Sequence, residues 1–412
     1  MTETPRPGKD NGPLSGVRVI EFGLFHAAPT CAAMLGNLGA EVIKVEDPTA
    51  GDPVRGLVRL YGQDSRLLSG RSIPFETYNA GKKSVTLNLR EPEGRELLYQ
   101  LVARADVFVH NVRAATAVAM GIDYDVLLRY HPRLVYASIS GFGPEGMEAS
   151  RPGLDPVGLA RSGLMTALSG GSGKPPILPP TGMADHIAGI ITAYGVLGAI
   201  LARDKTGMPQ RVESSLLGAA IWLGQLNLQY TLFSGRELRP LDHSSDPLLN
   251  SYQCEDGRWI FIAAPSERAW PALCTALGLE ALVTDERFGN FEARWRNRAI
   301  LLRLLEERFA TRTADQWAPV LAAQPGLVSE VVRRPTEVAD DPQVLANGYV
   351  AIVEHPVLGP AKRVGFPVHL NGARASAADA APVLGQHTVE VLNTLLGLSH
   401  EELSRLRENR VI

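Results

Sequence analysis

Two patterns of apolar and polar positions alternate along the first part of the chain. Short apolar runs rich in β-branched residues have the pattern of buried strands, at residues 17–22, 41–46, 106–110 and 134–140. The segments between them carry apolar residues at helical spacing, at residues 29–38, 92–105 and 123–133. Pro29 is expected at the first position of its helix, where a missing N–H costs nothing. The alternation predicts an α/β fold with a parallel sheet covered on both faces, which binds ligands at the carboxyl ends of its strands.

The rest of the chain contains a long apolar helix after Asp185 and two junctions rich in turn residues. After the first junction, RWIFIAA is predicted to be a strand, and the segment that follows is mainly helical. A final helix is predicted at 388–396. The predicted parts are a polar tail, a large domain, a small domain and a return to the large domain, at residues 1–15, 16–240, 241–326 and 327–412.

Composition excludes several classes of protein. The 412 residues carry 41 Lys and Arg against 44 Asp and Glu, a net charge of -3, which does not favour nucleic acid or an anionic membrane as a partner. Three cysteines, too few and too scattered for a disulfide framework, fit a reducing compartment, and the polar N-terminus lacks the apolar core of a signal peptide. The longest apolar run is shorter than a typical membrane span. We therefore expect a cytoplasmic protein.

Common cofactor motifs are missing or incomplete. The loop after the first strand is GLFHAAPT, which lacks the glycines that let a dinucleotide pyrophosphate approach the backbone. GGSGKP has Pro175 where a phosphate loop needs Ser or Thr for magnesium. The nine histidines show no spacing typical of a metal site. We expect no nicotinamide, no metal and no tightly bound cofactor.

Asp185 stands in PTGMADHIAGIITAYG, at the start of the long apolar helix, and has two interpretations. Asp is among the preferred N-cap residues, because its carboxylate accepts hydrogen bonds from the first free N–H groups. The same position suits a nucleophile, since the positive end of the helix favours the ionised carboxylate, which is the form that attacks a carbonyl. The residue pattern alone favours the cap and leaves the nucleophile open.

A set of ordered segments resembles the class III CoA-transferases, the CaiB/BaiF family, over nearly the whole chain. The segments are PLSGVRVIEFG, LGNLGAEVIKVEDPTAGDPVRG, NAGKKSVTLNL, DVFVHNVR, MGIDYDVL, PRLVYASISGFGPEG, TGMADHIAG, DDPQV, EHP and LGQHTVEVL. The resemblance implies a Rossmann-like large domain built from both chain ends, a smaller α+β domain, and two ring-like subunits interlocked as a homodimer. It also implies an acyl-CoA thioester and a small carboxylic acid as substrates.

The resemblance assigns roles to individual residues. The nucleophilic aspartate of the family falls on Asp185. Positions that bind CoA or substrate fall on Phe25, His26, Ala27, Leu87, Asn111, Val112, Arg113 and Asp155. Arg113 matches an arginine that binds CoA phosphate in some members, and Asp155 matches an acidic residue close to the reacting thioester in others. Two basic positions of certain members are replaced here, by Asp47 and Ala119.

The implied reaction moves CoA from a donor acyl-CoA to an acceptor acid through an aspartyl anhydride and an aspartyl-CoA thioester. Backbone N–H groups at the helix start are expected to stabilise the oxyanions. Racemases of the family carry a histidine directly before the position of Asp155, where this chain has Leu154. Racemisation needs a proton-transfer group on each face of the α-carbon, so transfer is favoured. A 2-methylacyl-CoA racemase with another base, and a non-catalytic CoA-thioester binder, are the alternatives.

Overall fold

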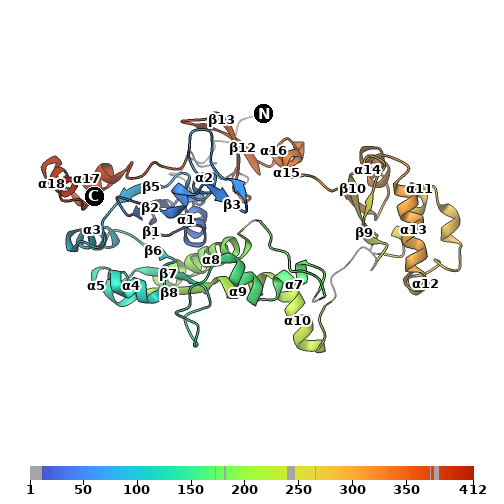
Figure 1. Cartoon of the computed structure of the whole chain (residues 1–412), viewed down its shortest axis with the longest axis horizontal. Coiled ribbons are helices and arrows are strands. Elements are labelled where there is room, and N and C mark those ends of the chain that lie inside the picture. Colours follow the sequence, from blue (N-terminus) through green and yellow to red (C-terminus); the bar gives the residue numbers. More distant parts are fainter. Residues whose placement is uncertain are drawn as a thin grey trace. The chain divides into compact units, whose positions relative to one another are not determined.

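The computed structural model of the chain describes residues 12–171, 173–180, 182–238, 246–264, 266–371, 373–374 and 380–412. The chain divides into two compact units. The first takes residues 1–169, 175–238 and 342–412, and the second takes 170–174 and 239–341 (Figure 1). The first unit is therefore built from both ends of the chain. The predicted polar tail lies mostly outside the described residues, as does the start of the junction near 240.

A six-stranded parallel sheet forms the centre of the first unit. Its strands are β1 (Arg18–Phe22), β2 (Glu41–Glu46), β5 (Lys83–Thr86), β6 (Val107–His110), β7 (Val135–Ser140) and β8 (Gln210–Ser215). They lie in the order β5-β2-β1-β6-β7-β8, which is the doubly wound order of a Rossmann sheet. The sequence pattern predicted the parallel sheet, and the structure confirms it.

Alternate strand residues face two different cores. Val19, Val107 and Val135 join one core with helices α1 (Ala27–Asn37), α6 (Asp155–Arg161), α8 (Met183–Thr206) and α9 (Leu216–Leu223). Ile20 and Phe108 join the opposite core. Helices α3 (Pro92–Val102), α5 (Tyr124–Tyr130), α17 (Thr388–Leu396) and α18 (His400–Glu408) contribute to that second core. The C-terminal helices thus help to cover the N-terminal sheet.

Helix boundaries differ from the sequence predictions at two places that matter for the site. Helix α1 begins at Ala27, so Pro29 is its third residue rather than its first. This position tolerates proline, since the first N–H groups of a helix have no partner within it. Helix α8 begins at Met183, before Asp185, with Gly182 as its N-cap in the left-handed region. By length and apolar composition α8 is able to span a membrane, but its alanines pack in the core of the unit.

The second unit has its own antiparallel sheet and core. Strands β9 (Leu249–Gln253), β10 (Trp259–Ala263) and β11 (Val328–Val331) pack with helices α11 (Ala269–Leu277), α12 (Phe291–Arg296), α13 (Arg298–Phe309) and α14 (Ala314–Ala322). Trp317 and Tyr252 are its largest buried side chains. We placed the return to the large domain at 327, whereas β11 pairs with β10 and keeps the second unit intact to Asp341.

Small elements complete the chain. The first unit also contains η2 (Pro53–Gly56), β3 (Arg59–Leu60), β4 (Gln63–Asp64), α2 (Ile73–Asn79), α4 (Ala114–Met120), α7 (Leu164–Leu168), α10 (Gln225–Ser234), α16 (Pro342–Ala346), β12 (Val350–His355), β13 (Gly359–Val364), β14 (His369–Leu370) and β15 (Ala373–Arg374). The second also contains η3 (Glu280–Val283) and α15 (Pro335–Val338).

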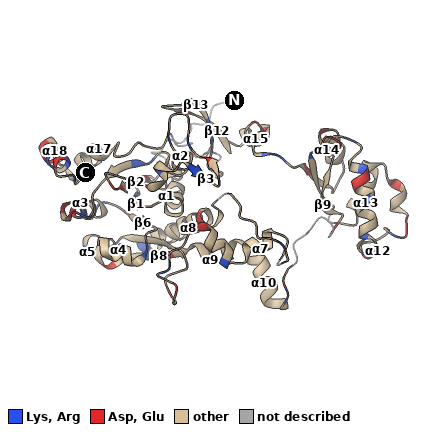
Figure 2. Ribbon diagram, viewed as in Figure 1, with Lys and Arg blue, Asp and Glu red and all other residues tan. Residues whose placement is uncertain are grey.

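Acidic and basic residues are interspersed along the described chain, as on α13 (Figure 2).

Candidate active site

The loops after β1 and β6 meet at the carboxyl edge of the parallel sheet. The two strands are neighbours, and the chain leaves them toward opposite sides of the sheet, which makes their loops the expected ligand position of a doubly wound fold. The Asn111 side chain joins the loops. It accepts a hydrogen bond from the Leu24 amide and donates one to the Leu24 carbonyl, both at 2.8 Å. The predicted CoA contact Asn111 therefore also fixes the backbone of the predicted CoA loop.

Buried charges hold the rest of that loop. Lys44 on β2 donates to the Gly23 carbonyl at 2.6 Å and pairs with Glu21 at 2.8 Å and Asp52 at 3.0 Å. Asp52 in turn accepts a hydrogen bond from the Phe25 amide at 3.1 Å. Phe25 has a φ of 59° and a half-exposed ring. Because a non-glycine residue seldom adopts this conformation, the hydrogen bonds around it impose the shape of the loop.

The structure at the start of α8 shows whether Asp185 caps the helix. The prediction that Asp185 is the N-cap is wrong, because Gly182 holds that position. The Asp155 carboxylate, from the first turn of α6, accepts hydrogen bonds from the amides of Ala184 at 2.6 Å and Asp185 at 3.1 Å. Asp155 thus caps the helix in place of a local residue. The same contacts occupy two of the amides that we expected to stabilise oxyanions.

The Asp185 side chain is released from capping and faces the loop after β1. Its Oδ2 lies 3.9 Å from Nδ1 of His26, the N-cap residue of α1. The His26 ring stacks on Tyr78 with centroids 3.9 Å apart, and its Nε2 lies 3.4 Å from Nδ1 of His186. A Cβ at Gly182 would collide with the His26 ring, so glycine permits this approach.

Burial sets the protonation of this group of side chains. Burial first, and the charge of Asp155 second, raise the pKa of Asp185 to about 7. Burial and the neighbouring His186 lower the pKa of His26 to about 3. At neutral pH the His26–Asp185 contact therefore joins a neutral imidazole to a carboxyl group and is not an ion pair. Asp155 also has a raised pKa because it is buried, although the two α8 amides oppose the shift.

The remaining predicted residues differ in burial. Ala27 is buried in the first turn of α1, and Val112 is half-buried. Leu87 is 1% exposed and lies in the core that contains Ile20 and Phe108. Arg113, the N-cap of α4, is exposed and makes no side-chain hydrogen bond or ion pair within the described residues. Asp47 closes its own turn by accepting from the Thr49 amide at 2.8 Å.

Sequence reasoning missed three side chains that lie near Asp185, namely Tyr61, Tyr78 and His186. Tyr78 comes from α2, and the charge of Asp185 contributes, after burial, to raising the pKa of Tyr78 to about 12. His186 follows Asp185 directly, and this adjacency was the one signal available in the sequence. The two tyrosines lie far from Asp185 along the chain and belong to no motif, so only the fold brings them to the site.

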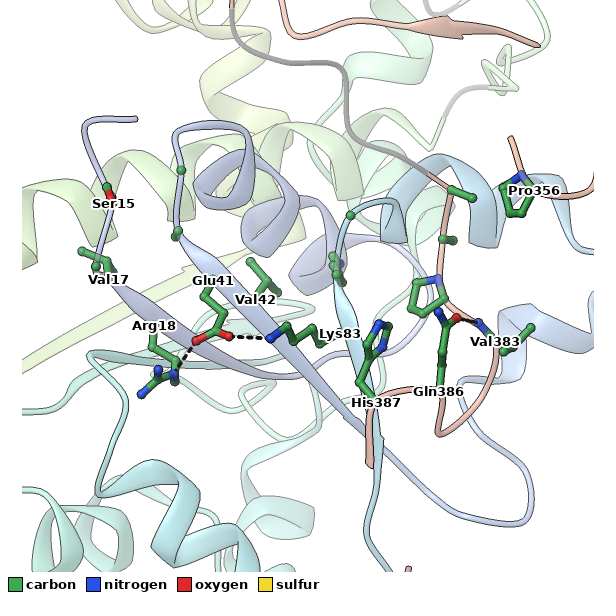
Figure 3. Close-up of a pocket in the computed structure, with 18 of the residues that line it drawn as sticks. Ser15, Val17, Arg18, Glu41, Val42, Lys83, Pro356, Val383, Gln386 and His387 are labelled. Carbon is green, nitrogen blue, oxygen red and sulfur yellow. Dashed lines mark hydrogen bonds and ion pairs between the residues drawn. The ribbon is translucent and has the colours of Figure 1, made fainter. Parts of the chain in front are cut away.

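A cavity of about 850 Å³ lies at the opposite edge of the sheet, where β1, β2 and β5 begin (Figure 3). Its basic side chains already have acidic partners. Glu41 pairs with Arg18 at 2.6 Å and with Lys83 at 3.0 Å, as Figure 3 shows, and Lys82 pairs with Glu21 at 2.6 Å. Because these basic side chains are paired, the cavity provides less free positive charge for CoA phosphates than the unpaired guanidinium of Arg113 does. In the described chain, no group of three His, Cys, Asp or Glu residues is arranged to hold a metal ion.

Comparisons with known proteins identify the family of the chain. A sequence model of CoA-transferase family III matches residues 14–388. (R)-2-hydroxy-4-methylpentanoate CoA-transferase of Clostridioides difficile is 33% identical over 403 residues, which are 97% of this chain and 99% of that protein. Human succinyl-CoA:glutarate CoA-transferase is 30% identical over 99% of this chain and 92% of its own length.

A solved structure of a CaiB/BaiF family protein from Brucella suis shares the fold. The TM-score is 0.80 at 30% sequence identity, over 93% of this chain and 99% of that one. These matches confirm the resemblance that the ordered segments suggested. The chain belongs to CoA-transferase family III and is a CoA-transferase.

Proposed function

We propose that the protein transfers CoA from an acyl-CoA to a carboxylic acid through covalent intermediates on Asp185. The observation that carries the proposal is a half-buried carboxylate which caps no helix and lies beside the loop after β1. Asp155 has taken over the capping role, so the position of Asp185 has no structural explanation of its own. Removal from water also makes a carboxylate a stronger nucleophile.

The reaction proceeds in paired additions and eliminations. An Asp185 oxygen attacks the thioester carbonyl, and collapse of the adduct expels CoA thiolate and leaves a mixed anhydride. The thiolate attacks the aspartyl carbonyl of the anhydride, which releases the donor acid and forms the aspartyl-CoA thioester. The acceptor carboxylate then attacks the aspartyl-CoA carbonyl, which expels CoA thiolate and forms a second mixed anhydride. The thiolate attacks the acceptor carbonyl of that anhydride, which yields the acceptor-CoA thioester and frees the Asp185 carboxylate. Each step exchanges one acyl bond for another, so the transfer requires no net proton movement.

The pH dependence of the transfer follows from Asp185. Only the carboxylate attacks, and its pKa is raised from 3.8 to about 7. We expect kcat/KM to be low at pH 5 and to rise through an apparent pKa near 7, in contrast to an exposed aspartate, which would be fully ionised throughout. Initial rates from pH 5 to 9 measure this. A flat profile across that range would contradict the raised pKa.

Asp155→Asn provides a matched test, because the amide oxygen still accepts the two α8 amides while the charge is lost. The charge of Asp155 is the second cause of the raised Asp185 pKa. The midpoint should therefore move to lower pH. Since two coupled carboxyls titrate as a pair, the wild-type midpoint belongs to both of them.

The two alternatives are less well supported. A racemase needs two proton-transfer groups, one on each side of the α-carbon. If each group lies about 3–3.5 Å from that carbon, the two groups are about 6–7 Å apart. His26 lies 3.9 Å from Asp185, and Leu154 points outward, 68% exposed. Uptake of deuterium at the α-carbon of a 2-methylacyl-CoA would indicate a racemase. A non-catalytic binder would show CoA binding without exchange.

The identity of the acids is open to a direct screen. Relatives at 30–33% identity are named for different acids, including 2-hydroxy-4-methylpentanoate, phenyllactate, D-citramalate and glutarate. Four acyl-CoA donors incubated with a panel of mono- and dicarboxylic acids, with products read by mass spectrometry, test the proposal. Formation of a new acyl-CoA that requires both partners supports transfer, and hydrolysis alone contradicts it.

We also propose that two copies interlock as a homodimer. Helices α9 and α10 carry a row of exposed apolar side chains, among them Trp222, Leu226 and Phe233, the last 85% exposed. An exposed apolar surface of this kind is typical of a protein interface. No side chain of α10 is buried within the chain.

Interlocking predicts a specific exchange behaviour. Light scattering of dilute protein should give a mass near twice 44.4 kDa. When tagged and untagged dimers are mixed, mixed dimers should not form under native conditions, because separation requires unfolding. They should form after denaturation and refolding. A stable active monomer, or rapid native exchange, would contradict the interlocked assembly.

A further inference from the structure

Two histidines meet beside Asp185, one buried and one exposed. His26 is 8% exposed, whereas His186 is an exposed residue in the first turn of α8. Nε2 of His26 lies 3.4 Å from Nδ1 of His186, within hydrogen-bond distance, and the ring centroids are 5.6 Å apart. The covalent steps on Asp185 do not by themselves require either imidazole, so the pair needs a separate explanation.

Close packing of α1 against α8 brings these side chains together. A Cβ at Gly189 would lie 2.7 Å from the Ala27 carbonyl oxygen, so glycine permits the approach of the two helices. His26 directly precedes Ala27. Asp185 lies about one helical turn before Gly189, so the same contact sets the His26 ring opposite the carboxylate. The Tyr78 ring stacks on His26 with an angle of 24° between the planes and holds the imidazole in its orientation.

The neighbours of His26 determine which of its nitrogens carries the proton. Burial lowers the pKa of His26 to about 3, so the ring is neutral and only one nitrogen is protonated. Nδ1 faces the Asp185 carboxylate at 3.9 Å, where an N–H attracts the negative charge and a lone pair repels it. With the proton on Nδ1, the lone pair on Nε2 requires a donor. Within the described residues, His186 is the hydrogen-bond partner of Nε2, so the outer histidine sets the tautomer of the inner one.

A donor on Nδ1 of His26 faces the charge that develops on Asp185 itself. When CoA thiolate attacks the aspartyl carbonyl of the anhydride, the negative charge moves onto an Asp185 oxygen. The amides of Ala184 and Asp185 are bound to Asp155 and do not serve that oxygen. At 3.9 Å, Nδ1 and Oδ2 are too far apart for a hydrogen bond in the free protein. Hydrogen bonds between catalytic groups are often long in the free enzyme and shorten in the transition state.

We infer that His186 is a positioning residue, which donates a hydrogen bond to Nε2 of His26 and so keeps Nδ1–H of His26 directed at the Asp185 oxyanion; this rests on the proposed function. As the thiolate sulfur bonds to Cγ of Asp185, the carbonyl π pair moves to the Asp185 oxygen. His26 donates a hydrogen bond to that oxygen and keeps its proton. The pair then returns, the bond from Cγ to the anhydride oxygen breaks, and the donor acid leaves as a carboxylate.

The test compares His186→Leu with His186→Asn. Leucine has no donor, whereas the side-chain nitrogen of asparagine is bonded to Cγ, as Nδ1 of histidine is, and still donates. We expect kcat to fall about 10–100-fold in His186→Leu while KM for acyl-CoA stays within about twofold, because the oxyanion forms only after binding. His186→Asn should recover most of that loss. His400→Leu makes the same change at an exposed residue of α18 and should leave kcat near that of the wild type.

Nitrogen-15 NMR reads the tautomer directly. In protein labelled with ¹⁵N-histidine, protonated and unprotonated ring nitrogens have well separated shifts, and the His26 signals are those lost in His26→Gln. The wild type and His186→Asn should carry the proton on Nδ1 of His26. In His186→Leu, part of the population should shift it to Nε2. Thermal unfolding of each variant checks that the fold is intact.

The outcomes distinguish hydrogen bonding by His186 from a purely steric role. An unchanged His26 tautomer or wild-type kcat in His186→Leu overturns the proposal. A folded His186→Asn protein as slow as His186→Leu also overturns it, because the shape of the imidazole and not its donor would then matter. A raised KM with unchanged kcat has the same consequence. Absence of CoA transfer in the wild type would instead contradict the proposed function, whatever tautomer the NMR spectrum shows.

Discussion

Asp185→Ser should lose at least about a thousand-fold in transfer rate, which is some 4 kcal/mol of activation barrier. Serine removes the carboxylate that forms the anhydride, and the neighbouring Asp155 carboxylate is held by two α8 amides. Asp185→Asn should be equally slow, but asparagine can deamidate to aspartate, so serine is the cleaner variant. The measurement is the rate of exchange of CoA between two acids, followed by mass spectrometry. Hydroxylamine added during turnover of the wild type should leave a hydroxamate on the Asp185 peptide.

Stability provides the control for this loss. Gly182 is the N-cap and Asp155 accepts the first amides, so neither variant removes a cap. The pKa of Asp185 is raised on folding, so the folded state binds its proton more tightly than the unfolded chain does. Ionisation therefore destabilises the fold progressively as pH rises from about 4 to 7.

A neutral side chain at 185 should consequently raise the free energy of unfolding by roughly 1–2 kcal/mol at pH 8, less than the full linkage of about 1.4 kcal/mol per pKa unit because the site is partly solvated. Near pH 4 it should change nothing. Urea unfolding at the two pH values measures the difference. A folded Asp185→Ser protein that still exchanges CoA at the wild-type rate would refute the nucleophile, and with it the proposed mechanism.

Hydrophobic patterning predicted β1, β2, β6 and β7 of the central sheet, but not β5. Residues 17–22 and 41–46 are rich in Val and Ile because both faces of a parallel sheet are buried, and their charged residues Glu21 and Lys44 are buried as an ion pair. The end of the second unit was harder to predict. β11 is a short strand whose place is fixed by pairing with β10, and that pairing has no local signal.

Within the site, local sequence reasoning failed where a tertiary contact replaced a local one. Asp185 has the residue type and position of a helix cap, but a carboxylate from α6 reaches the same amides and takes that role. Tyr61 belongs to a hairpin with two residues per strand, which is too short to show the alternating hydrophobic pattern of a strand. The resemblance to the family located Asp185 and Asp155. Only the fold shows that Asp155 caps α8 and so leaves the Asp185 carboxylate without a capping role.

The prediction for Arg113 rests on charge. CoA phosphates are polyanionic and the chain has a net charge of -3, so local cations must provide the attraction. Arg113 stands exposed after β6, two residues beyond Asn111, whose side chain holds the loop after β1, and within the described residues it has no ion pair. Arg113→Ala should therefore weaken binding of free CoA by roughly 1.5–3 kcal/mol, or about 10–150-fold in Kd.

Arg129→Ala, on the exposed side of α5, removes the same charge elsewhere and provides the matched control. It should leave the Kd nearly unchanged. Titration calorimetry at several salt concentrations separates the two effects, because the loss of a phosphate contact also reduces the dependence of Kd on salt. Arg113→Lys should recover part of the affinity, since lysine keeps the charge without the planar pair of donors. If Arg113→Ala and Arg129→Ala bound CoA equally well, Arg113 would not be the phosphate ligand.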